Sequence, residues 1–210
     1  MVPHVFPAIV LSLVTLLATS HTDAREVSGV TLKEQVRLAP NGPVLSLNGA
    51  GLRRTFMIVK TYVGALYLEN PSDDPAQVMN SQESKRMLFH VLLNRVSARK
   101  VARALRDALV LNVTDEAYKS LKPSVEQFLS MFDGTLHEGD ECYIDYLPGV
   151  GTRVTVAGVD KGIIPGEAFY RAMLAIWVGD HPVSRTLKAE ILGEKTKTAQ
   201  ASAWQRHRDN

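Results

Sequence analysis

The chain has 210 residues, of which 45% are hydrophobic and 22% charged, with 24 basic residues against 22 acidic ones. This length suits one sizeable domain, and the composition excludes a generally disordered chain. The near balance of charge argues against a nucleic-acid binder that relies on a strong overall field. The single cysteine, Cys142, excludes an internal disulfide, and its apolar neighbours Tyr143 and Ile144 predict a buried, unreactive thiol.

The N-terminal segment has the pattern of a targeting signal. Residues 6–18 form a nearly unbroken apolar run, which is long enough for a secretory signal but short for a bilayer span. Small and polar residues follow it, so we expect residues 1–24 to be a signal peptide cleaved after Ala24 and the protein to be exported to a periplasm. No Lys or Arg precedes the run, which leaves an uncleaved anchor as the alternative. This segment is the one part of the chain expected to contact a membrane.

The stretch from Leu47 to Glu69 is the most distinctive part of the chain. We interpret its glycines, at positions 49 and 51, as a turn before a long strand of β-branched and aromatic residues. Arg53 and Tyr62 are polar exceptions in this strand, and a guanidinium with a phenol can together hold a carboxylate or carbonyl oxygen. The plainer interpretation is an exposed arginine and a packed tyrosine. Because side chains alternate along a strand, convergence of the two requires a bulge or a turn near residues 53–55.

The remaining pattern predicts one α+β domain over residues 25–193. His90 is expected to be a packed core histidine without an acidic partner, and the basic face around Arg99 and Arg103 either is solvated or meets anionic lipid headgroups. The expected elements are an edge strand or hairpin arm over 27–38, a short helix over 73–80 capped by Asp74, a strand over 86–96, a helix capped by Ser97, a helix from 114 that Pro123 kinks or splits, strands over 141–147 and 152–159, a turn over 162–166, helices over 167–178 and 182–192, and a disordered tail over 194–210.

Several chemistries lack their sequence signals. The two glycines at 49 and 51 lack the third glycine and the following helix of a dinucleotide fingerprint, and there is no phosphate-binding loop or serine-hydrolase elbow. The cluster His137, Glu138, Asp140 and Glu141 contains metal-ligand types, but its spacing matches no strong metal motif. We therefore expect neither a metal nor a cofactor.

Five blocks of sequence occur in a characteristic order over residues 27–193, namely Leu47–Arg53, Lys60–Leu68, Gly139–Asp140, Tyr146–Thr152 and Phe169–Gly193. Together they resemble the bacterial exported branch of the chalcone isomerase-like family. The resemblance implies an open-faced β-sandwich, in which a large antiparallel sheet is packed by a layer of helices and a ligand cleft lies between them.

The resemblance also implies a function for the polar residues. Plant enzymes of this family close a chalcone to a flavanone, using an arginine, a threonine, a tyrosine and an asparagine. By the resemblance, Arg53 matches the arginine and Tyr62 the threonine, while Ser97 and Ala104 occupy the other two positions. Losing one preorganised donor costs on the order of 10²–10³ in rate, so two replaced groups argue against catalysis.

The expected function is therefore non-catalytic binding of a fatty acid or similar amphiphilic carboxylate by Arg53, Tyr62 and Ser97. Two alternatives stay open. The first is an isomerase, an intramolecular lyase of the chalcone isomerase type that uses Arg53 and Tyr62. The second is a periplasmic interaction domain with a closed cleft. The expected partner is a small amphiphilic or aromatic ligand, and not a nucleic acid.

Overall fold

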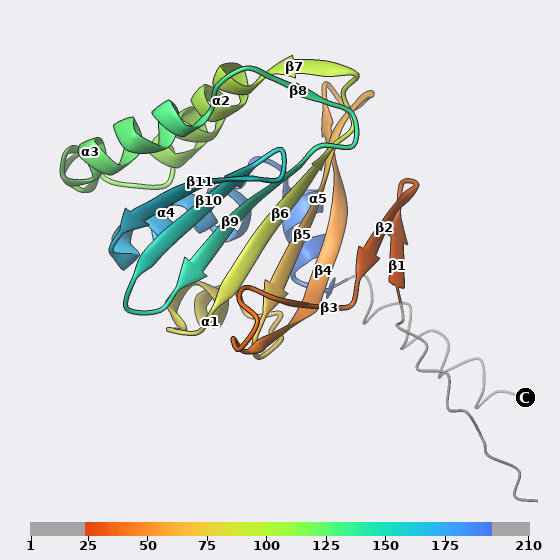
Figure 1. Cartoon of the computed structure of the whole chain (residues 1–210), viewed down its shortest axis with the longest axis horizontal. Coiled ribbons are helices and arrows are strands. Elements are labelled where there is room, and N and C mark those ends of the chain that lie inside the picture. The colour runs from red at the N-terminus through yellow and green to blue at the C-terminus, as the bar shows by residue number, and fades with distance from the viewer. Residues whose placement is uncertain (1–23, 195–210) are drawn as a thin grey trace, which may run out of the picture.

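The computed structural model describes residues 24–194, in which a curled antiparallel sheet carries helices on one face (Figure 1). The expected signal segment up to residue 23 and the expected tail from residue 195 lie outside the described residues. The seven sheet strands, in spatial order, are β11 (Val159–Pro165), β10 (Gly151–Val156), β9 (Glu141–Leu147), β6 (Lys85–Val91), β5 (Val59–Leu68), β4 (Val44–Thr55) and β3 (Gln35–Arg37).

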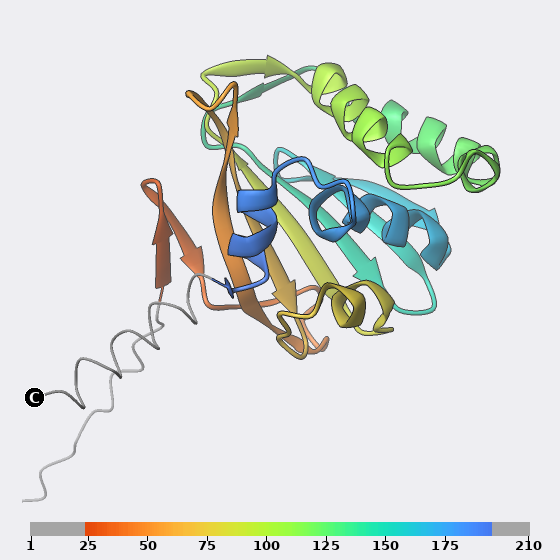
Figure 2. The ribbon, with the colours of Figure 1, turned by 180° about the vertical axis from the view of Figure 1, so that it is seen from behind.

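Two small ribbons and a helical layer complete the described chain. Figure 2 shows α4 and α5 lying against one face of the sheet, with α2 and α3 side by side next to α4. The ribbons are β1 (Ala24–Val27) with β2 (Val30–Lys33), and β7 (Arg95–Ser97) with β8 (Thr135–His137). The helices are α1 (Pro75–Asn80), α2 (Ala98–Val110), α3 (Asp115–Met131), α4 (Glu167–Val178) and α5 (Arg185–Ile191).

Alternation along the strands separates two apolar clusters, one on each face of the sheet. The larger cluster lies between sheet and helices, and α4 is apolar almost all round because it is buried there. The smaller cluster lies on the opposite face and includes Leu45, Val63 and Tyr67 with the β2 residues Val30 and Leu32. The open-faced α+β architecture expected from the sequence is therefore confirmed.

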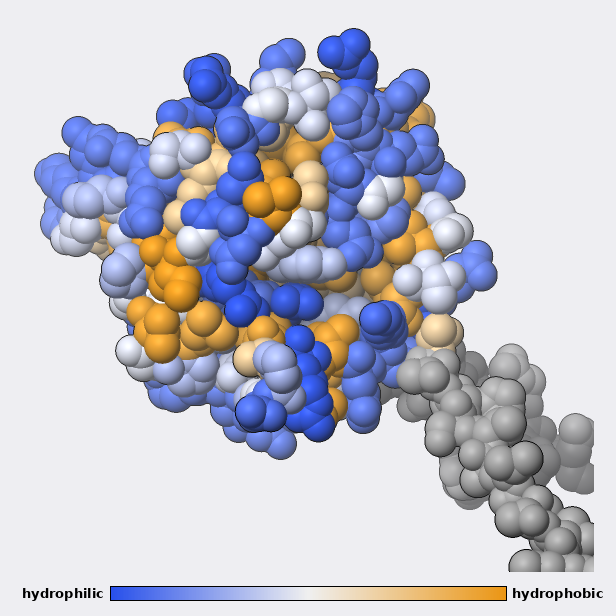
Figure 3. Space-filling view, in the orientation of Figure 1, coloured by the Kyte–Doolittle hydropathy of each residue, from blue (hydrophilic) through white to orange (hydrophobic). Residues whose placement is uncertain are grey.

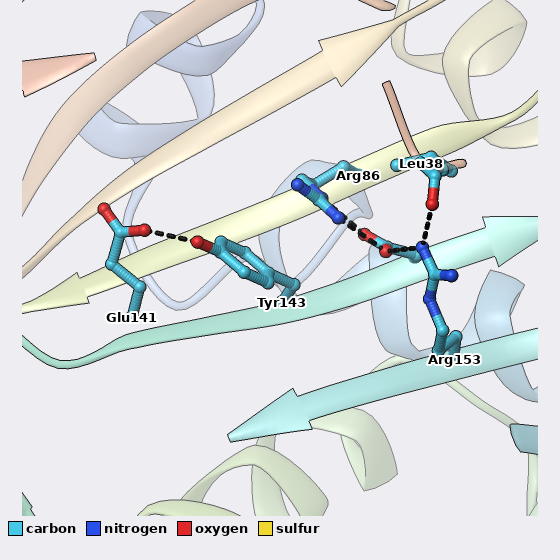
Figure 4. Close-up of polar contacts among 6 residues, drawn as sticks. Leu38, Arg86, Glu141, Tyr143 and Arg153 are labelled. Atoms are coloured by element: carbon cyan, nitrogen blue, oxygen red, sulfur yellow. Dashed lines mark hydrogen bonds and ion pairs between the residues drawn. The ribbon is translucent and has the colours of Figure 1, made fainter. Parts of the chain in front are cut away.

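The face opposite the helices also holds a charged network (Figure 4). Asp145 is fully buried and accepts two hydrogen bonds from Arg86, of 2.7 and 2.8 Å, and one of 2.8 Å from Arg153. Arg153 also donates to the carbonyl of Leu38, which ties the segment after β3 to the sheet. In the space-filling view this face is a mosaic of hydrophilic and hydrophobic residues (Figure 3).

Several expected helices agree closely with the structure. Asp74 caps α1 by accepting from the amide of Ala76 at 2.8 Å, and Pro75 is its first residue, as its sequence predicts. Of the two outcomes expected at Pro123, the split does not occur, because α3 runs through the proline. Leu121 and Val125, on either side of the proline, are buried in the same cluster, and this packing outweighs the lost backbone hydrogen bond.

Two strand predictions and the prediction for His90 need correction. The expected turn over 162–166 lies largely inside β11, which continues because a bulge at Lys161 and the positive φ of Gly162 (108°) accommodate the irregularity. The strand expected over 86–96 ends at Val91 and resumes as β7. His90 is not a core histidine without an acidic partner, because its Nδ1 lies 3.3 Å from a carboxylate oxygen of Glu141 on the neighbouring strand.

The central stretch is not one strand but a long hairpin. β4 and β5 are joined by a turn at residues 56–58, and Gly49 and Gly51 lie inside β4 rather than in a turn. A Cβ atom at Gly49 would lie 2.3 Å from the carbonyl oxygen of Glu190, and one at Gly51 would lie 2.0 Å from a carboxylate oxygen of Glu190. The glycines are therefore required because α5 packs directly on the backbone of β4.

Candidate ligand-binding site

The candidate site lies near the turn of the β4–β5 hairpin, where Arg53 and Tyr62 are paired directly across the two strands. The ladder shifts by one residue between Arg53 and Arg54, which leaves Thr61 as the extra residue. The hydroxyl of Thr61 donates to the carbonyl oxygen of Arg53 at 2.9 Å and holds this bulge together. The hairpin thus places on neighbouring strands two residues that one straight strand would have separated.

Both side chains belong to the helix-side face of the sheet. Tyr62 packs against the larger cluster, and its ring lies 5.9 Å from that of Phe89. Arg53 is two residues beyond Gly51, whose open side faces α5, so alternation turns Arg53 to the same face. Directly paired residues of an antiparallel ladder project to the same side, which brings the guanidinium and the phenol together.

The phenol of Tyr62 is held in a defined state by its surroundings. The indole Nε1 of Trp177, in the last turn of α4, donates to the phenol oxygen at 3.0 Å. Burial raises the pKa of Tyr62 to about 12, against the smaller opposing effects of the Trp177 hydrogen bond and the Arg53 charge. The phenol is therefore protonated at neutral pH. Because its oxygen is engaged as an acceptor, its own proton is free to be donated to a ligand oxygen.

Arg53 has a backbone partner but no ion pair with a carboxylate of the described chain. Its Nη1 donates to the carbonyl of Arg54, and the side chain is only partly buried. Glu190 of α5 lies against the same strand and accepts from the backbone amide of Leu52 at 3.2 Å. A guanidinium has five N–H donors, so Arg53 keeps donors for a bidentate carboxylate.

Ser97 lies at the same end of the molecule but is not joined to this pair. It is the N-cap of α2 as its sequence predicts, although its hydroxyl makes no capping hydrogen bond. Within the described residues no hydrogen bond connects Ser97 with Arg53 or Tyr62. The chain between β6 and α2 does contact the hairpin, because the amide of Leu92 donates to the carbonyl of Thr61 at 3.0 Å.

Other candidate sites have different properties. Residues 24–194 contain no group of three or more His, Cys, Asp or Glu side chains placed to hold a metal ion. Cys142 is fully buried, and burial raises the pKa of its thiol to about 11, which agrees with the unreactive thiol expected. A groove of about 1140 Å³ lies between α1, α3 and α4, and one of about 430 Å³ lies between the β1–β2 ribbon and β4. Neither groove includes Arg53 or Tyr62.

Two buried charged side chains, those of Asp145 and Lys85, are not among the residues predicted from the sequence. Asp145 is an acid inside an otherwise apolar strand, a pattern that could have marked it as a paired core residue. Lys85 is 2% exposed, with its ammonium 4.9 Å from the ring centre of Tyr146 and donating to the carbonyls of Ser81 and Glu83. Burial lowers the pKa of Lys85 to about 8, only partly offset by acidic neighbours, Glu83 first.

The fold and this geometry define a class: an antiparallel sheet with one helical layer and an arginine–tyrosine pair on the covered face. The profile of the chalcone isomerase-like family matches residues 24–193, and the chain belongs to that family. Among solved structures, the chain is similar to the fatty-acid binding protein AtFAP1 of Arabidopsis thaliana, with a TM-score of 0.58 and 13% identity over 77% of this chain and 97% of that one. No curated protein matches the sequence. At this identity the structural likeness establishes the shared fold.

Proposed function

We propose that this protein binds a fatty acid or a similar amphiphilic carboxylate without converting it. The observation that carries the proposal is the direct pairing of Arg53 with Tyr62 on the helix-side face, with no carboxylate of the described chain in an ion pair with Arg53. A partly buried cation without its own counter-ion favours an anionic ligand, since burial without a partner is costly. The fold shared with a fatty-acid binding protein supports the same function.

The head of the ligand is held from two sides. Arg53 contributes a charge-assisted hydrogen bond, and Tyr62 donates the phenol proton that Trp177 leaves free. The pKa of Tyr62, at about 12, keeps that proton in place throughout the physiological range. The same value makes Tyr62 poorly matched to acid–base catalysis near neutral pH, which supports binding over the isomerase alternative.

The tail of the ligand lies along apolar side chains at the same end of the sheet. Leu93, Val96 and Val101 are only partly buried and pack against the cluster that also contains Tyr62. They come from the connection after β6, from β7 and from α2, and that connection touches the hairpin through the hydrogen bond from the Leu92 amide to the Thr61 carbonyl. Ser97 follows Val96 directly and precedes the first turn of α2.

The test is titration of purified full-length protein with palmitate by isothermal calorimetry. Replacing Arg53 by Ala is expected to weaken binding at least about tenfold, because hydrogen bonds to charged groups contribute about 1.5–3 kcal/mol. Tyr62→Phe is expected to weaken it about fivefold through loss of one donor.

Arg54→Ala is the matched control, since Arg54 is the next residue, is exposed and points to the other face. Its affinity for palmitate is expected to equal that of the wild type. If Arg53→Ala and Arg54→Ala lost the same affinity for palmitate, the loss would be due to the net positive charge of the hairpin, and the proposed site would be contradicted. A wild type that binds no palmitate would remove the fatty-acid proposal.

We also propose that the protein is exported. The support is the apolar run at residues 6–18 followed by small and polar residues. Mass spectrometry of the protein recovered from the periplasm should give a chain that begins at Arg25. Recovery of the intact chain from the cytoplasm would contradict export.

A further inference from the structure

The turn of the β4–β5 hairpin presents the most exposed apolar side chains of the described structure. Phe56, Met57 and Ile58 are 85%, 88% and 81% exposed, and Val59 after them is 42% exposed. The hairpin projects at one end of the sheet in both ribbon views (Figures 1 and 2). Four successive apolar residues at a projecting tip are unusual for a soluble surface, and such patches commonly mark an interaction site.

The backbone of this turn adds an independent observation. Phe56 and Met57 have φ values of 51° and 62°, in the left-handed region that hairpin turns usually fill with Asn, Asp or Gly. Phe56 and Met57 therefore occupy backbone positions at which Asn, Asp or Gly would be less strained. Strain of this kind is commonly retained for function.

The charged side chains of the hairpin itself are all positive. Arg54 and Lys60 are paired across the hairpin just below the turn, and both are exposed. The sequence from residue 35 to residue 68 contains no acidic residue. The neighbouring β7–β8 ribbon places Arg95 opposite His137, and the loop after β8 adds the acids Glu138 and Asp140. The positive charge is thus concentrated on the hairpin itself.

We propose that this tip inserts into an anionic lipid bilayer surface. With a strand rise of about 3.3 Å per residue, the cations lie roughly 7 Å behind the end of the turn. Interfacial elements bury their apolar side about 5–10 Å, with basic residues at the headgroups, and the hairpin has this arrangement of apolar end and cationic collar. A bilayer surface fits a tip of this kind because it takes up exposed apolar side chains at its interface and pairs anionic headgroups with the cations behind them.

The interaction goes beyond the proposed ligand binding and does not depend on it. Arg53 and Tyr62 lie one pair below Arg54 and Lys60, so an inserted tip would hold the ligand site next to the membrane surface. No helix in residues 24–194 is long and apolar enough to cross a bilayer. The contact proposed is therefore a peripheral one made by a hairpin.

The first test measures co-sedimentation of the full chain with vesicles of phosphatidylcholine and phosphatidylglycerol in equal parts. A variant with Phe56→Asn, Met57→Gly and Ile58→Ser is expected to lose at least about tenfold in vesicle affinity, because it removes the apolar area. Its thermal unfolding midpoint should not fall, since Asn and Gly suit the left-handed turn. Replacing Arg54 or Lys60 by Gln is expected to cost about fivefold each on these vesicles.

Val150→Ser is the matched control, because Val150 is 51% exposed in the turn between β9 and β10. It should leave vesicle affinity unchanged. The tip variant should still bind palmitate in solution, and this separates failure of the membrane proposal from failure of the ligand proposal.

The second test reports insertion directly, whatever residues 1–23 contribute to vesicle binding. An environment-sensitive fluorophore on Met57→Cys is expected to shift to the blue when vesicles are added, while the same label on Val150→Cys should not. Cys142 is fully buried and escapes labelling in the folded protein. An unshifted label at position 57 would overturn the proposal. A shift that needs no vesicles and grows with protein concentration would also overturn it, in favour of a second copy of the chain.

Discussion

The two faces of the sheet each carry an arginine beside a tyrosine, and the two pairs differ in one respect. Arg86 lies 4.1 Å from the ring centre of Tyr143 and forms a double hydrogen bond with the buried carboxylate of Asp145. Arg53 stands opposite Tyr62 without such a carboxylate in the described chain. The first pair is structural because the chain supplies its counter-charge, and the second, which has no such carboxylate in the described chain, is the pair that we propose for a ligand.

The largest effect is expected from removing the counter-charge itself. Asp145→Ala would leave Arg86 and Arg153 partly buried without their carboxylate, at a cost of about 3–5 kcal/mol in the free energy of unfolding. Urea denaturation measures this loss. Asp107→Ala, which breaks the exposed pair with Arg106, is the control and should cost less than about 1 kcal/mol. Equal losses would contradict the structural role of the network.

Lys85 extends the comparison to a buried cation with only carbonyl and aromatic partners. Its pKa of about 8 lies below the ordinary value of 10.5, so the unfolded chain binds more protons than the folded one between these values. The wild type should therefore gain stability as the pH rises from 8 to 10.5.

Relative to Lys85→Met, this gain should reach at most about 3.5 kcal/mol, since one pKa unit corresponds to about 1.4 kcal/mol. Comparing the two proteins at each pH cancels the titration of tyrosines that both contain. A difference in unfolding free energy that stays constant from pH 8 to 10.5 would show that Lys85 titrates normally.

The smallest effect on stability is expected from a substitution at the proposed ligand-binding site. Arg53→Ala should change the free energy of unfolding by no more than about 0.5 kcal/mol, because no carboxylate depends on it. Arg86→Ala should cost several times more, since it leaves Asp145 buried with one partner fewer. Urea denaturation of both variants measures these changes in the free energy of unfolding. A large loss of stability in Arg53→Ala would show that Arg53 is a structural residue.

The sequence predicted those elements whose signals are local. Asp74 and Pro75 identify the start of α1, and the apolar run from Phe169 to Val178 identifies α4. The turn at residues 56–58 was missed because it contains no Gly, Pro or Asn and continues an apolar pattern.

The sequence draws attention to the residues of the candidate site but not to their arrangement. Arg53 and Tyr62 stand out as polar residues in an apolar stretch, but only the hairpin and its bulge bring them to one face. The contact of Tyr62 with Trp177 joins residues 115 positions apart, and that of Arg86 with Asp145 joins residues 59 apart. Partners at such separations depend on strand register and helix packing, which no local pattern specifies.

The close packing of α5 on β4 has a consequence for the order in which the molecule is completed. Asn48 donates to the carbonyl of Ile191, and the amide of Leu52 donates to the side chain of Glu190, across 143 and 138 residues. During synthesis, the strand that carries Arg53 emerges long before the helix that covers its glycines. Contacts of this range are costly to close and form late. The nascent chain therefore cannot finish this edge of the sheet until nearly all of the domain has left the ribosome.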